Sequence, residues 1–374
     1  MKDRRGIGKP AALLALAFLL LAAPAPGAAF RVSGVWERPV HDGVVFYHYK
    51  GTIANQPVHA YLLLVNASRP DLRIRPMLAY DRVDRLETVP SMAKRYGALA
   101  AVNGSFFNRK ESAPFPVGFL MVSGRPIFHT GHRRSAFGMT KDRSAIFGYP
   151  NAKGIVYIEA SGRYVYLNGM NRPRKENDVI AYTVEYGDRT RTNEHGREVV
   201  VEKGRVTGIR VGDSPIPRDG FVLSLHGAAR RHVDLFAVGE RVSYYFVVDD
   251  RWVNTLDIVT GGPLLVTGGM VVRQAGLEEG LRKGHGGRIP QTAVGSMDDG
   301  RVVLAVVDGR RAGYSVGLTY DEFASFLARL GVTDAVGMDG GGSSTMVVGG
   351  EVVNRPSDGA PRRVNNGIGV LRAR

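Results

Sequence analysis

Three consecutive glycines set between one aspartate and three hydroxyl residues most restrict how this chain can fold. Asp339 precedes the glycines at 340–342, and hydroxyl residues at 343–345 follow them. Glycine has no side chain, so its backbone can adopt positive φ and approach a ligand closely. Successive amide groups in such a loop can form a concave nest for an anion. A tight hairpin turn is the alternative interpretation of the same run.

The flanking segments favour a binding site over a plain turn. An apolar run at 302–307 leads into a second aspartate, Asp308, and a shorter apolar run at 336–338 leads into Asp339. Two buried strands that each end in Asp-Gly indicate a site at strand ends. Polar loops at 354–359 then follow the glycines.

The segment between the two aspartates predicts one helix over residues 319–330. Thr319 and Glu322 at its start fit a capping box, and apolar residues at helical spacing give it one hydrophobic face. If the two flanking strands are parallel neighbours, Asp308 and Asp339 emerge at the same carboxyl edge and face one crevice.

The rest of the chain has the pattern of short strands. Aromatic and β-branched runs at 44–49 and 58–65, and a period-two run at 72–77, predict a mostly antiparallel region. A short helix is predicted over 88–96, and strands at regular intervals predict a β-rich subdomain within 160–255. We therefore expect an α+β fold with a β-rich mixed sheet core, a few helices and a β-loop-α-β unit near the C-terminus.

The first 29 residues have the pattern of a signal peptide. A basic start precedes a short apolar stretch at 11–23, and small residues at 27–29 make a cleavage site before Phe30 plausible. The apolar stretch is too short to span a bilayer comfortably, although an uncleaved anchor is the alternative. We expect a secreted or periplasmic protein with no stable membrane span after signal cleavage.

The charge balance favours anionic partners. The whole chain carries a net charge of +15, and residues 1–29 hold four basic and one acidic residue, so the remainder is near +12. Such a surface suits phosphorylated glycans or anionic membrane surfaces, although a merely solvated surface would have the same composition. Lys and Arg are scattered and no nucleic-acid-binding motif is present, so we expect no nucleic-acid partner. The chain has no cysteine, which excludes disulfides and thiolate metal sites.

Several motifs occur in the order typical of one enzyme family. They lie at residues 103–108, 261–264, 288–295, 308–315, 339–345 and 354–357. Together they resemble the phosphodiester glycosidase family, over most of the chain after about Gly97. The resemblance implies that residues 30–374 form a catalytic domain that hydrolyses the glycosidic bond of a sugar 1-phosphodiester, of the N-acetylglucosamine type or a related glycan. One departure is Gln291, where family members usually carry Arg; it removes one phosphate contact.

Two carboxylates are the predicted catalytic pair. Hydrolysis at an anomeric carbon passes through an oxocarbenium-like transition state and usually requires two carboxyl groups. We assign Asp339 as nucleophile or general base and Asp308 as its partner. Because a phosphodiester is already a good leaving group, stabilising the departing anion matters more than strong acid catalysis.

The predicted substrate-binding residues surround this pair. They are Asn103, Arg288, Arg310, Gly341, Gly342, Ser343 and Ser344. Arginine offers a planar fork that suits bidentate phosphate binding. A divalent cation such as Ca²⁺ or Mg²⁺ could serve the same purpose, with Asp339, Asp308 and Asn103 as candidate oxygen ligands. The sequence leaves the metal requirement open.

Three histidines are assigned no catalytic role. Gly131 lies between His129 and His132, which argues against a helical metal pair. His226 is predicted to be structural, or to support the site through a neighbouring residue, rather than catalytic. Two alternative functions stay open at this point. One is a metal-dependent phosphodiesterase that cleaves the P–O bond, and the other is a non-catalytic glycan-binding protein of the cell envelope.

Overall fold

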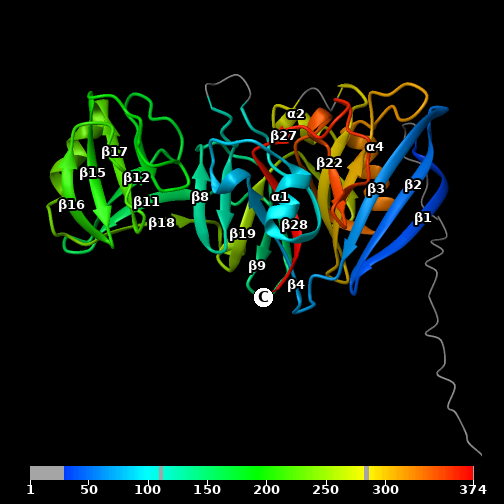
Figure 1. The fold of residues 1–374 in the computed structure, drawn as a ribbon, viewed down its shortest axis with the longest axis horizontal. Helices are drawn as coiled ribbons and strands as arrows, with labels where there is room; N and C mark the ends of the chain where they lie inside the picture. The colour runs from blue at the N-terminus through cyan, green and yellow to red at the C-terminus, as the bar shows by residue number, and fades with distance from the viewer. Residues whose placement is uncertain (1–28, 109–112, 282–285, 374) are drawn as a thin grey trace, which may run out of the picture.

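The computed structural model describes residues 29–108, 113–281 and 286–373, and Figure 1 shows them as an elongated, strand-rich molecule. The predicted signal peptide, apart from its last residue, lies outside the described residues. No helix in the described part is long and apolar enough to cross a membrane.

Strands dominate the described residues. The strands up to residue 210 are β1 (Arg31–His41), β2 (Val44–Ile53), β3 (Gln56–Val65), β4 (Leu72–Leu78), β5 (Glu87–Thr88), β6 (Ala98–Asn103), β7 (Phe119–Val122), β8 (Arg125–His129), β9 (Ala136–Thr140), β10 (Ala145–Gly148), β11 (Lys153–Ile158), β12 (Arg163–Leu167), β13 (Gly169–Met170), β14 (Val179–Tyr182), β15 (Gly196–Glu202) and β16 (Arg205–Arg210). The later strands are β17 (Gly220–His226), β18 (Val242–Val247), β19 (Thr255–Thr260), β20 (Leu264–Thr267), β21 (Met270–Val271), β22 (Gln291–Met297), β23 (Val302–Val307), β24 (Val332–Gly337), β25 (Met346–Val348), β26 (Glu351–Val352), β27 (Arg363–Val364) and β28 (Asn366–Arg372). The α-helices are α1 (Val89–Tyr96), α2 (Ala275–Glu278) and α4 (Tyr320–Arg329).

The sheets are almost entirely antiparallel. An eight-stranded sheet has the order β1-β2-β3-β23-β22-β24-β20-β21, and a five-stranded sheet has the order β26-β25-β6-β28-β4. A ten-stranded sheet runs β10-β9-β19-β7-β8-β13-β14-β17-β15-β16, with β12-β11-β18 and β27-β5 as smaller sheets. Only the β13–β14 pair is parallel among the described strands. The predicted α+β fold with a β-rich mixed core is confirmed.

The predicted β-loop-α-β unit is present, but its two strands are not neighbours. β22 lies between β23 and β24 and pairs with both in the antiparallel sense. The expectation of adjacent parallel strands is therefore wrong. Because β23 and β24 both oppose β22, they still run in the same direction, and their carboxyl ends lie at the same edge of the sheet.

Burial on both faces explains the continuous apolar sequence of β23. Val303, Ala305 and Val307 belong to the core beneath α4, together with Phe323. The alternate residues of the strand, such as Leu304, belong to the main core on the other face. α4 is therefore held against one face of the eight-stranded sheet, where it packs on β20 and β24.

Both longer helices begin where the sequence predicts. In α4, Glu322 N donates to Thr319 Oγ1 at 3.2 Å and Thr319 N donates to Glu322 Oε2 at 2.9 Å, which completes the capping box. In α1, Thr88 is the N-cap, and the helix ends at Gly97 with φ of 66°. Left-handed backbone of this kind favours glycine.

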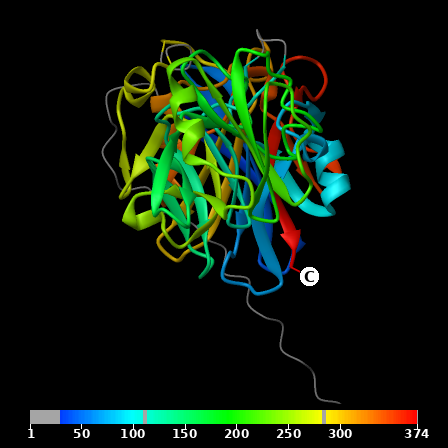
Figure 2. The same ribbon diagram turned by 90° about the vertical axis from the view of Figure 1, so that its left-hand side faces the viewer.

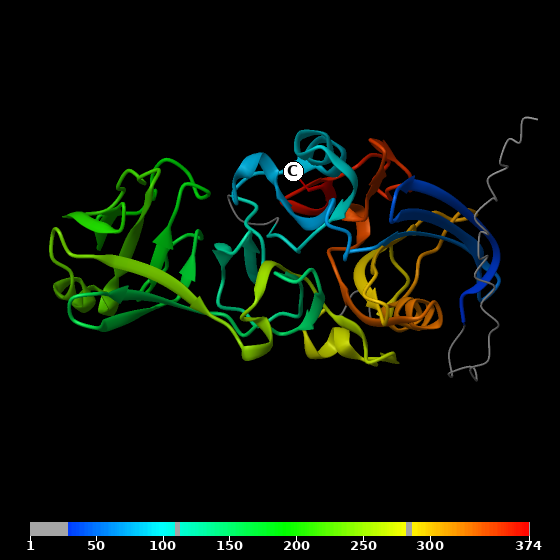
Figure 3. The same cartoon turned by 90° about the horizontal axis from the view of Figure 1, so that it is seen from below.

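Residues 153–247 contribute most of the strands at one end of the molecule. β11, β12 and β15–β18 lie together on the left of Figure 1, and Figure 2 views the molecule from that side. Figure 3 shows this group, the central strands and the β1–β3 region in succession along the long axis. The apolar residues of the group at residues 153–247 form a separate core that includes Val199 and Leu223. The ten-stranded sheet nevertheless continues from the central strands into β16.

Candidate active site

The two predicted catalytic aspartates follow strands that end at the same sheet edge. Gln291, the first residue of β22, lies opposite Val307, the last residue of β23. On its other side, Ala293 of β22 lies opposite Gly337, the last residue of β24. Because neighbouring strands lie about 4.8 Å apart, the two strand ends are separated by roughly 10 Å. The topology therefore brings Asp308 and Asp339 to one edge.

Asp308 is buried and accepts hydrogen bonds at both carboxylate oxygens; 1% of the residue is exposed. Asn354 Nδ2 donates to Oδ1 at 2.9 Å, and the Tyr314 hydroxyl donates to Oδ2 at 3.2 Å. The backbone amide of Arg355 donates to Oδ1 at 3.1 Å and to Oδ2 at 2.9 Å. The carboxylate thus ties the loop after β23 to the loop after β26.

An aromatic cluster extends from Asp308 toward β2. The hydroxyls of Tyr61 and Tyr314 lie 2.7 Å apart, and the His59 ring stacks on Tyr314 with centroids 4.2 Å apart. His48 Nε2 lies 2.9 Å from His59 Nδ1. Burial, with the nearby charges of His59 and Lys50, lowers the pKa of His48 to about 4. These rings are therefore neutral near pH 7.

Burial raises the pKa of Asp308 above its ordinary value. Hydrogen bonds from Asn354, from the Arg355 amide and from the two tyrosines act in the opposite direction without cancelling it. No Arg or Lys side chain of the described residues forms an ion pair with this carboxylate. Its stabilisation comes from neutral donors and dipoles, which leaves its charge uncompensated.

Asp339 is the more accessible of the two aspartates and is partly exposed. Its backbone is fixed on both sides, because its amide donates to Gly104 O at 3.0 Å and its carbonyl accepts from Asn103 Nδ2 at 2.6 Å. Burial, and next the negative charge of Asp339, raise the pKa of Tyr320 to about 12, while the positive charge of Arg134 acts to lower it. Asp339, Tyr320 and Arg134 therefore interact electrostatically.

Asn103 supports Asp339 from inside the protein. Its residue is fully buried, and its Oδ1 accepts from Thr292 Oγ1 at 2.8 Å and from Thr345 N at 3.1 Å. With Nδ2 bonded to Asp339, the side chain joins β6, β22 and the glycine-rich loop. Because all of these contacts are with protein atoms, Asn103 positions the glycine-rich loop.

The glycine-rich loop is a buried turn rather than an open nest of amides. Gly341 N donates to Pro290 O, and Ser343 N and Ser344 N donate back to the loop carbonyls of Gly340 and Gly341. Gly341 has φ of +63°, a conformation that favours glycine. Three amides of the predicted anion nest are thus already used.

Close side chains explain why the loop needs glycine at 342. A Cβ atom there would lie 2.1 Å from Arg362 Nη2 and 2.2 Å from Asp358 Oδ1. Arg362 also donates to Ser343 Oγ at 3.3 Å. The hydroxyl of Ser344 is buried without a hydrogen-bond partner among the described residues.

The three side chains considered for phosphate contact differ in their surroundings. Arg310 is exposed, and its guanidinium lies close to Gly341, where a Cβ atom would be 3.1 Å from Nη1. Arg288 instead pairs with Glu322, with Nη2 to Oε1 at 2.8 Å and Nε to Oε2 at 3.0 Å. Gln291 is buried and donates to Leu318 O at 2.5 Å. Arg310 is the most exposed of these three, Arg288 is partly exposed, and Gln291 is buried.

The Gly-Gly-Pro segment, residues 261–263, lies close to this edge. Gly262 N donates at 2.7 Å to the carbonyl oxygen of Gly337, which lies two residues before Asp339. A Cβ atom on Gly262 would lie 2.5 Å from Glu279 Oε2. The Glu279 carboxylate also accepts from the Ser135 hydroxyl at 2.7 Å.

A cavity of about 690 Å³ adjoins this group. Its lining includes Glu279, Arg134, Arg133, His132 and Lys175 as polar residues and Phe115 and Phe128 as aromatic ones. Arg134 connects the cavity with the Asp339 group, because its charge and that of Asp339 both act on Tyr320. The cavity has the size of a ligand site and mixes basic with apolar walls.

The candidate metal ligands do not gather around a common point. Among the described residues no group of three or more His, Asp or Glu side chains could hold a metal ion. Asn103 Oδ1 and both oxygens of Asp308 already accept hydrogen bonds from the protein. These donor sets do not fit a Ca²⁺ or Mg²⁺ site that uses both residues.

The three histidines discussed from the sequence lie in different surroundings. His129 is buried in β8, and burial lowers its pKa to about 4. His132 is exposed in the following loop. His226 ends β17 opposite Gly196, in the ten-stranded sheet.

Several residues of the site were not singled out from the sequence. They are Tyr61, Tyr314, His59, Glu279 and Tyr320. Tyr314 lies in a loop whose motif was recognised, so its spacing of six residues from Asp308 was a usable signal. Tyr61 had none, because it lies in an apolar strand far upstream and reaches Asp308 only through the pairing of β3 with β23.

The fold and the edge site define a β-rich protein in which two loops that each carry an aspartate meet at one sheet edge. The family model described as phosphodiester glycosidase matches residues 195–371. This part of the chain therefore belongs to the phosphodiester glycosidase family, and the resemblance inferred from the motifs is confirmed.

Individual relatives agree with the family match over shorter segments. The bovine N-acetylglucosamine-1-phosphodiester alpha-N-acetylglucosaminidase is 38% identical over 87 residues, which cover 21% of this chain and 16% of that enzyme. The chain is thus similar to a small part of that relative's length.

Solved structures share the fold over nearly the whole chain. A hypothetical protein from Synechocystis has a TM-score of 0.77 at 23% identity, covering 91% of this chain and 64% of its own. A Burkholderia pseudomallei protein, named as a "putative exported protein", has a TM-score of 0.75 at 20% identity, covering 94% of this chain and 99% of its own. At these identities the similarity concerns the fold.

Proposed function

We propose that this protein is an exported hydrolase that cleaves the glycosidic bond of a sugar 1-phosphodiester, of the N-acetylglucosamine type or a related glycan. The observation that carries the proposal is the family match over residues 195–371, which includes both aspartate-bearing loops. The common sheet edge of Asp308 and Asp339 supports it further. Export rests on the signal-like residues 1–29 and on the likeness to the Burkholderia protein.

In this proposal Asp339 is the group that meets the sugar. It is partly exposed, its backbone is held by Asn103 and Gly104, and the cavity beside Arg134 lies close to it. A carboxylate so placed can act as nucleophile or general base at the anomeric carbon. Asn103 is then a positioning residue that acts through Asp339.

Asp308 acts through its neighbours in the proposed mechanism. Because its carboxylate is buried, its effect on the reaction passes through Tyr314 and the loop that carries Arg355. The Arg355 guanidinium lies 4.3 Å from the centre of the Tyr314 ring, on the exposed side of this group. A negative charge beneath the two side chains holds them in place and favours positive charge at this edge.

The departing phosphate requires cations that are open to solvent. Arg310 and Arg355 are both exposed and lie on the loops after β23 and β26. We propose that they bind the phosphate, with the positive φ of Arg310 and of Gly341 shaping the local backbone. Arg288 can contribute only if its bidentate pair with Glu322 opens.

Hydrolysis of an N-acetylglucosamine 1-phosphodiester by the wild type and by Asp339→Asn tests the proposal. We expect free sugar and a phosphomonoester from the wild type, and a rate reduced by about 10²–10⁴-fold in the variant. The melting temperatures of the two proteins should agree, because the backbone contacts of Asp339 are retained.

The products separate the alternative functions. If sugar 1-phosphate is the product, the protein is a phosphodiesterase that breaks the P–O bond and not a glycosidase. Binding of the diester without turnover would identify a glycan-binding protein. Equal turnover by Asp339→Asn would remove Asp339 from the mechanism.

A further inference from the structure

A second cavity lies at the far end of the five-stranded sheet from the aspartates. Its volume is about 630 Å³. β28 joins the two places, because it starts at Asn366, whose carbonyl accepts from Gly104 N at 3.0 Å, and ends at Arg372 in the cavity wall. Seven residues of strand span roughly 20 Å. In Figure 1 the cavity end lies near the marked C-terminus.

Basic side chains dominate the wall of this cavity. They are Arg73, Arg75, Arg95, Lys141, Arg143 and Arg372. Asp257 is the single carboxylate residue in the wall, so the wall carries a formal excess of positive charge. A concave surface lined by one sign of charge focuses the electrostatic field and attracts counter-ions.

The period-two sequence of β4 places two of these arginines side by side. Leu72 and Ile74 point into the main core, so Arg73 and Arg75 point to the opposite face. Farther along that face, α1 covers Met77. The helix ends with Tyr96, and the uncovered part of the sheet forms the floor of the cavity.

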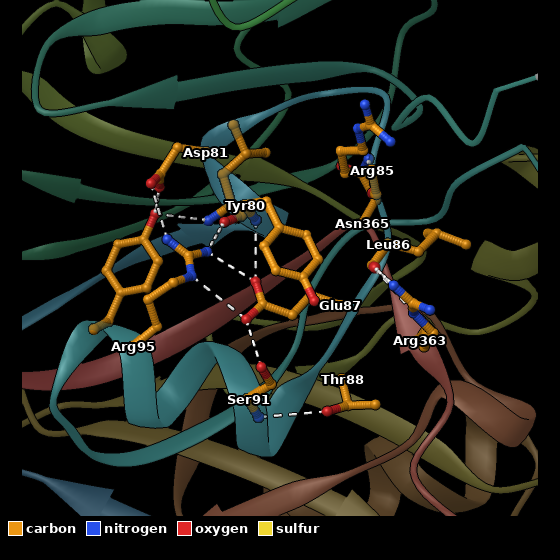
Figure 4. A network of polar contacts seen from close by, with 12 residues as sticks. Tyr80, Asp81, Arg85, Leu86, Glu87, Thr88, Ser91, Arg95, Arg363 and Asn365 are labelled. Atoms are coloured by element: carbon orange, nitrogen blue, oxygen red, sulfur yellow. Dashed lines mark hydrogen bonds and ion pairs between the residues drawn. The ribbon is translucent and has the colours of Figure 1, made fainter.

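Arg95 shows how this protein satisfies an arginine for structural purposes. Its guanidinium donates to Glu87 Oε2 at 2.8 Å, to Asp81 Oδ2 at 2.9 Å and to Leu78 O at 2.6 Å (Figure 4). Two carboxylates therefore balance its charge. Arg143 is also committed, since its guanidinium donates to the carbonyls of Arg69 and Leu72 at 2.6 and 2.7 Å.

Arg75 differs from both of these arginines. Its Nε is buried and has no hydrogen-bond partner, and its side chain makes no ion pair among the described residues. Lys141 and Arg372 are exposed, and neither forms an ion pair with another residue that the structure describes. Arg73 forms an ion pair with Asp257, in which Nη2 lies 3.3 Å from Oδ2. The other oxygen of that carboxylate accepts a hydrogen bond from Ser123 N at 2.8 Å. A buried guanidinium nitrogen without an acceptor is costly unless a ligand supplies one.

We propose that this cavity binds the phosphate group of a phosphate ester, at a site separate from the active site. A tetrahedral oxyanion offers several acceptor oxygens, which suits the Arg75 fork, its neighbour Arg73 and the flexible ammonium of Lys141. The proposal does not depend on the proposed hydrolase function, because none of its residues lies at the aspartate edge.

Phosphate binding to the intact protein tests the proposal. Isothermal titration with glycerol 3-phosphate and with inorganic phosphate, at constant ionic strength, would be performed on the wild type, Arg75→Gln and Lys141→Gln. We expect at least tenfold weaker binding in Arg75→Gln and a smaller loss in Lys141→Gln, which is exposed and should fold normally. Tighter binding of the ester than of free phosphate would assign the ligand to phosphate esters, and equal binding would assign it to free phosphate.

Two matched variants control for charge and for the other site. Arg210→Gln removes one exposed positive charge from β16, and Arg310→Gln removes one at the aspartate edge. Arg210→Gln should keep the wild-type affinity. Arg310→Gln should keep the binding event that Arg75→Gln weakens, and it should weaken only a separate binding event at the aspartate edge. Equal affinity in Arg75→Gln and Arg210→Gln would overturn the proposal. So would loss of binding in Arg310→Gln alone, or no binding of either probe to the wild type.

Discussion

Two carboxylates in this protein are equally shielded from solvent but are stabilised in opposite ways. Glu87 and Asp308 are each 1% exposed. Burial acts to raise the pKa of both, yet the pKa of Glu87 is lowered overall and that of Asp308 is raised. Asp308 is the more deeply enclosed of the two, and it also lacks the cationic partner that Glu87 has in Arg95.

Glu87 has a cation as partner. Arg95 donates to both of its oxygens, with the Ser91 hydroxyl at 2.7 Å and the Tyr80 amide at 3.0 Å as further donors (Figure 4). The network ties α1 to the turn after β4. Every strong donor is supplied by the protein, so nothing is left for a ligand.

Asp308 has only neutral donors. Asn354, Tyr314 and the Arg355 amide orient the carboxylate without neutralising it. Such an arrangement keeps a negative charge near the sheet edge at a cost in stability. The comparison teaches that a buried carboxylate without a cation is a candidate for function, whereas a paired one is a candidate for structure.

The largest expected effect is on activity. Asp308→Asn should lower kcat for sugar phosphodiester hydrolysis by about 10²-fold or more. Glu87→Gln should leave kcat within about threefold, because the Glu87 carboxylate is bonded to Tyr80, Ser91 and Arg95 and not to either aspartate loop. Steady-state kinetics with a pH profile of kcat/KM would measure both. Similar losses of kcat in the two variants would contradict the assignment of Asp308 to function and Glu87 to structure.

Stability should respond in the opposite order. Glu87→Gln leaves Arg95 with Asp81 alone and should cost about 2 kcal/mol, which is less than for a fully buried pair because Arg95 is partly exposed. Asp308→Asn should change the free energy of unfolding by less than about 1 kcal/mol, since the Tyr314 hydroxyl can turn to accept from the new amide. Urea unfolding monitored by fluorescence would give both values.

The pH dependence of stability should have opposite signs at the two residues. The pKa of Glu87 is lowered in the folded state, so its contribution is present above the unfolded pKa of about 4.3 and is lost as the pH falls through the folded value. The pKa of Asp308 is raised, so its contribution is present below the unfolded pKa of about 3.9 and is lost as the pH rises through the folded value.

Urea unfolding of both variants between pH 3 and pH 7 would check these signs. Relative to the wild type, Asp308→Asn should gain stability as the pH rises, and the deficit of Glu87→Gln should shrink as the pH falls. The same slope for both variants would contradict the assignment of the two pKa directions.

The smallest expected effect is that of metal removal. Dialysis against EDTA should leave activity unchanged, because the oxygens of Asn103 and Asp308 already accept protein hydrogen bonds. Activity assays before and after dialysis, with Ca²⁺ or Mg²⁺ added back, would measure it. Loss of activity that either ion restores would show that these side chains rearrange to bind metal.

Local sequence rules were sufficient for the elements of the fold. The Thr319–Glu322 capping box, the alternation in β4 and the apolar run of β23 each depend on contacts within a few residues or on burial patterns along one element. For that reason the helices and the order of elements in the C-terminal unit were predictable. The two Asp-Gly strand ends likewise indicated the correct sheet edge.

Tertiary structure alone decided how those elements meet. The insertion of β22 between β23 and β24, the approach of Tyr61 to the Asp308 group and the pairing of Arg288 with Glu322 all join segments far apart in the chain. No local propensity encodes such contacts, because strand pairing and burial are settled by packing of the whole core. Whether a charged side chain faces solvent, a ligand or an opposite charge is therefore a property of the folded molecule.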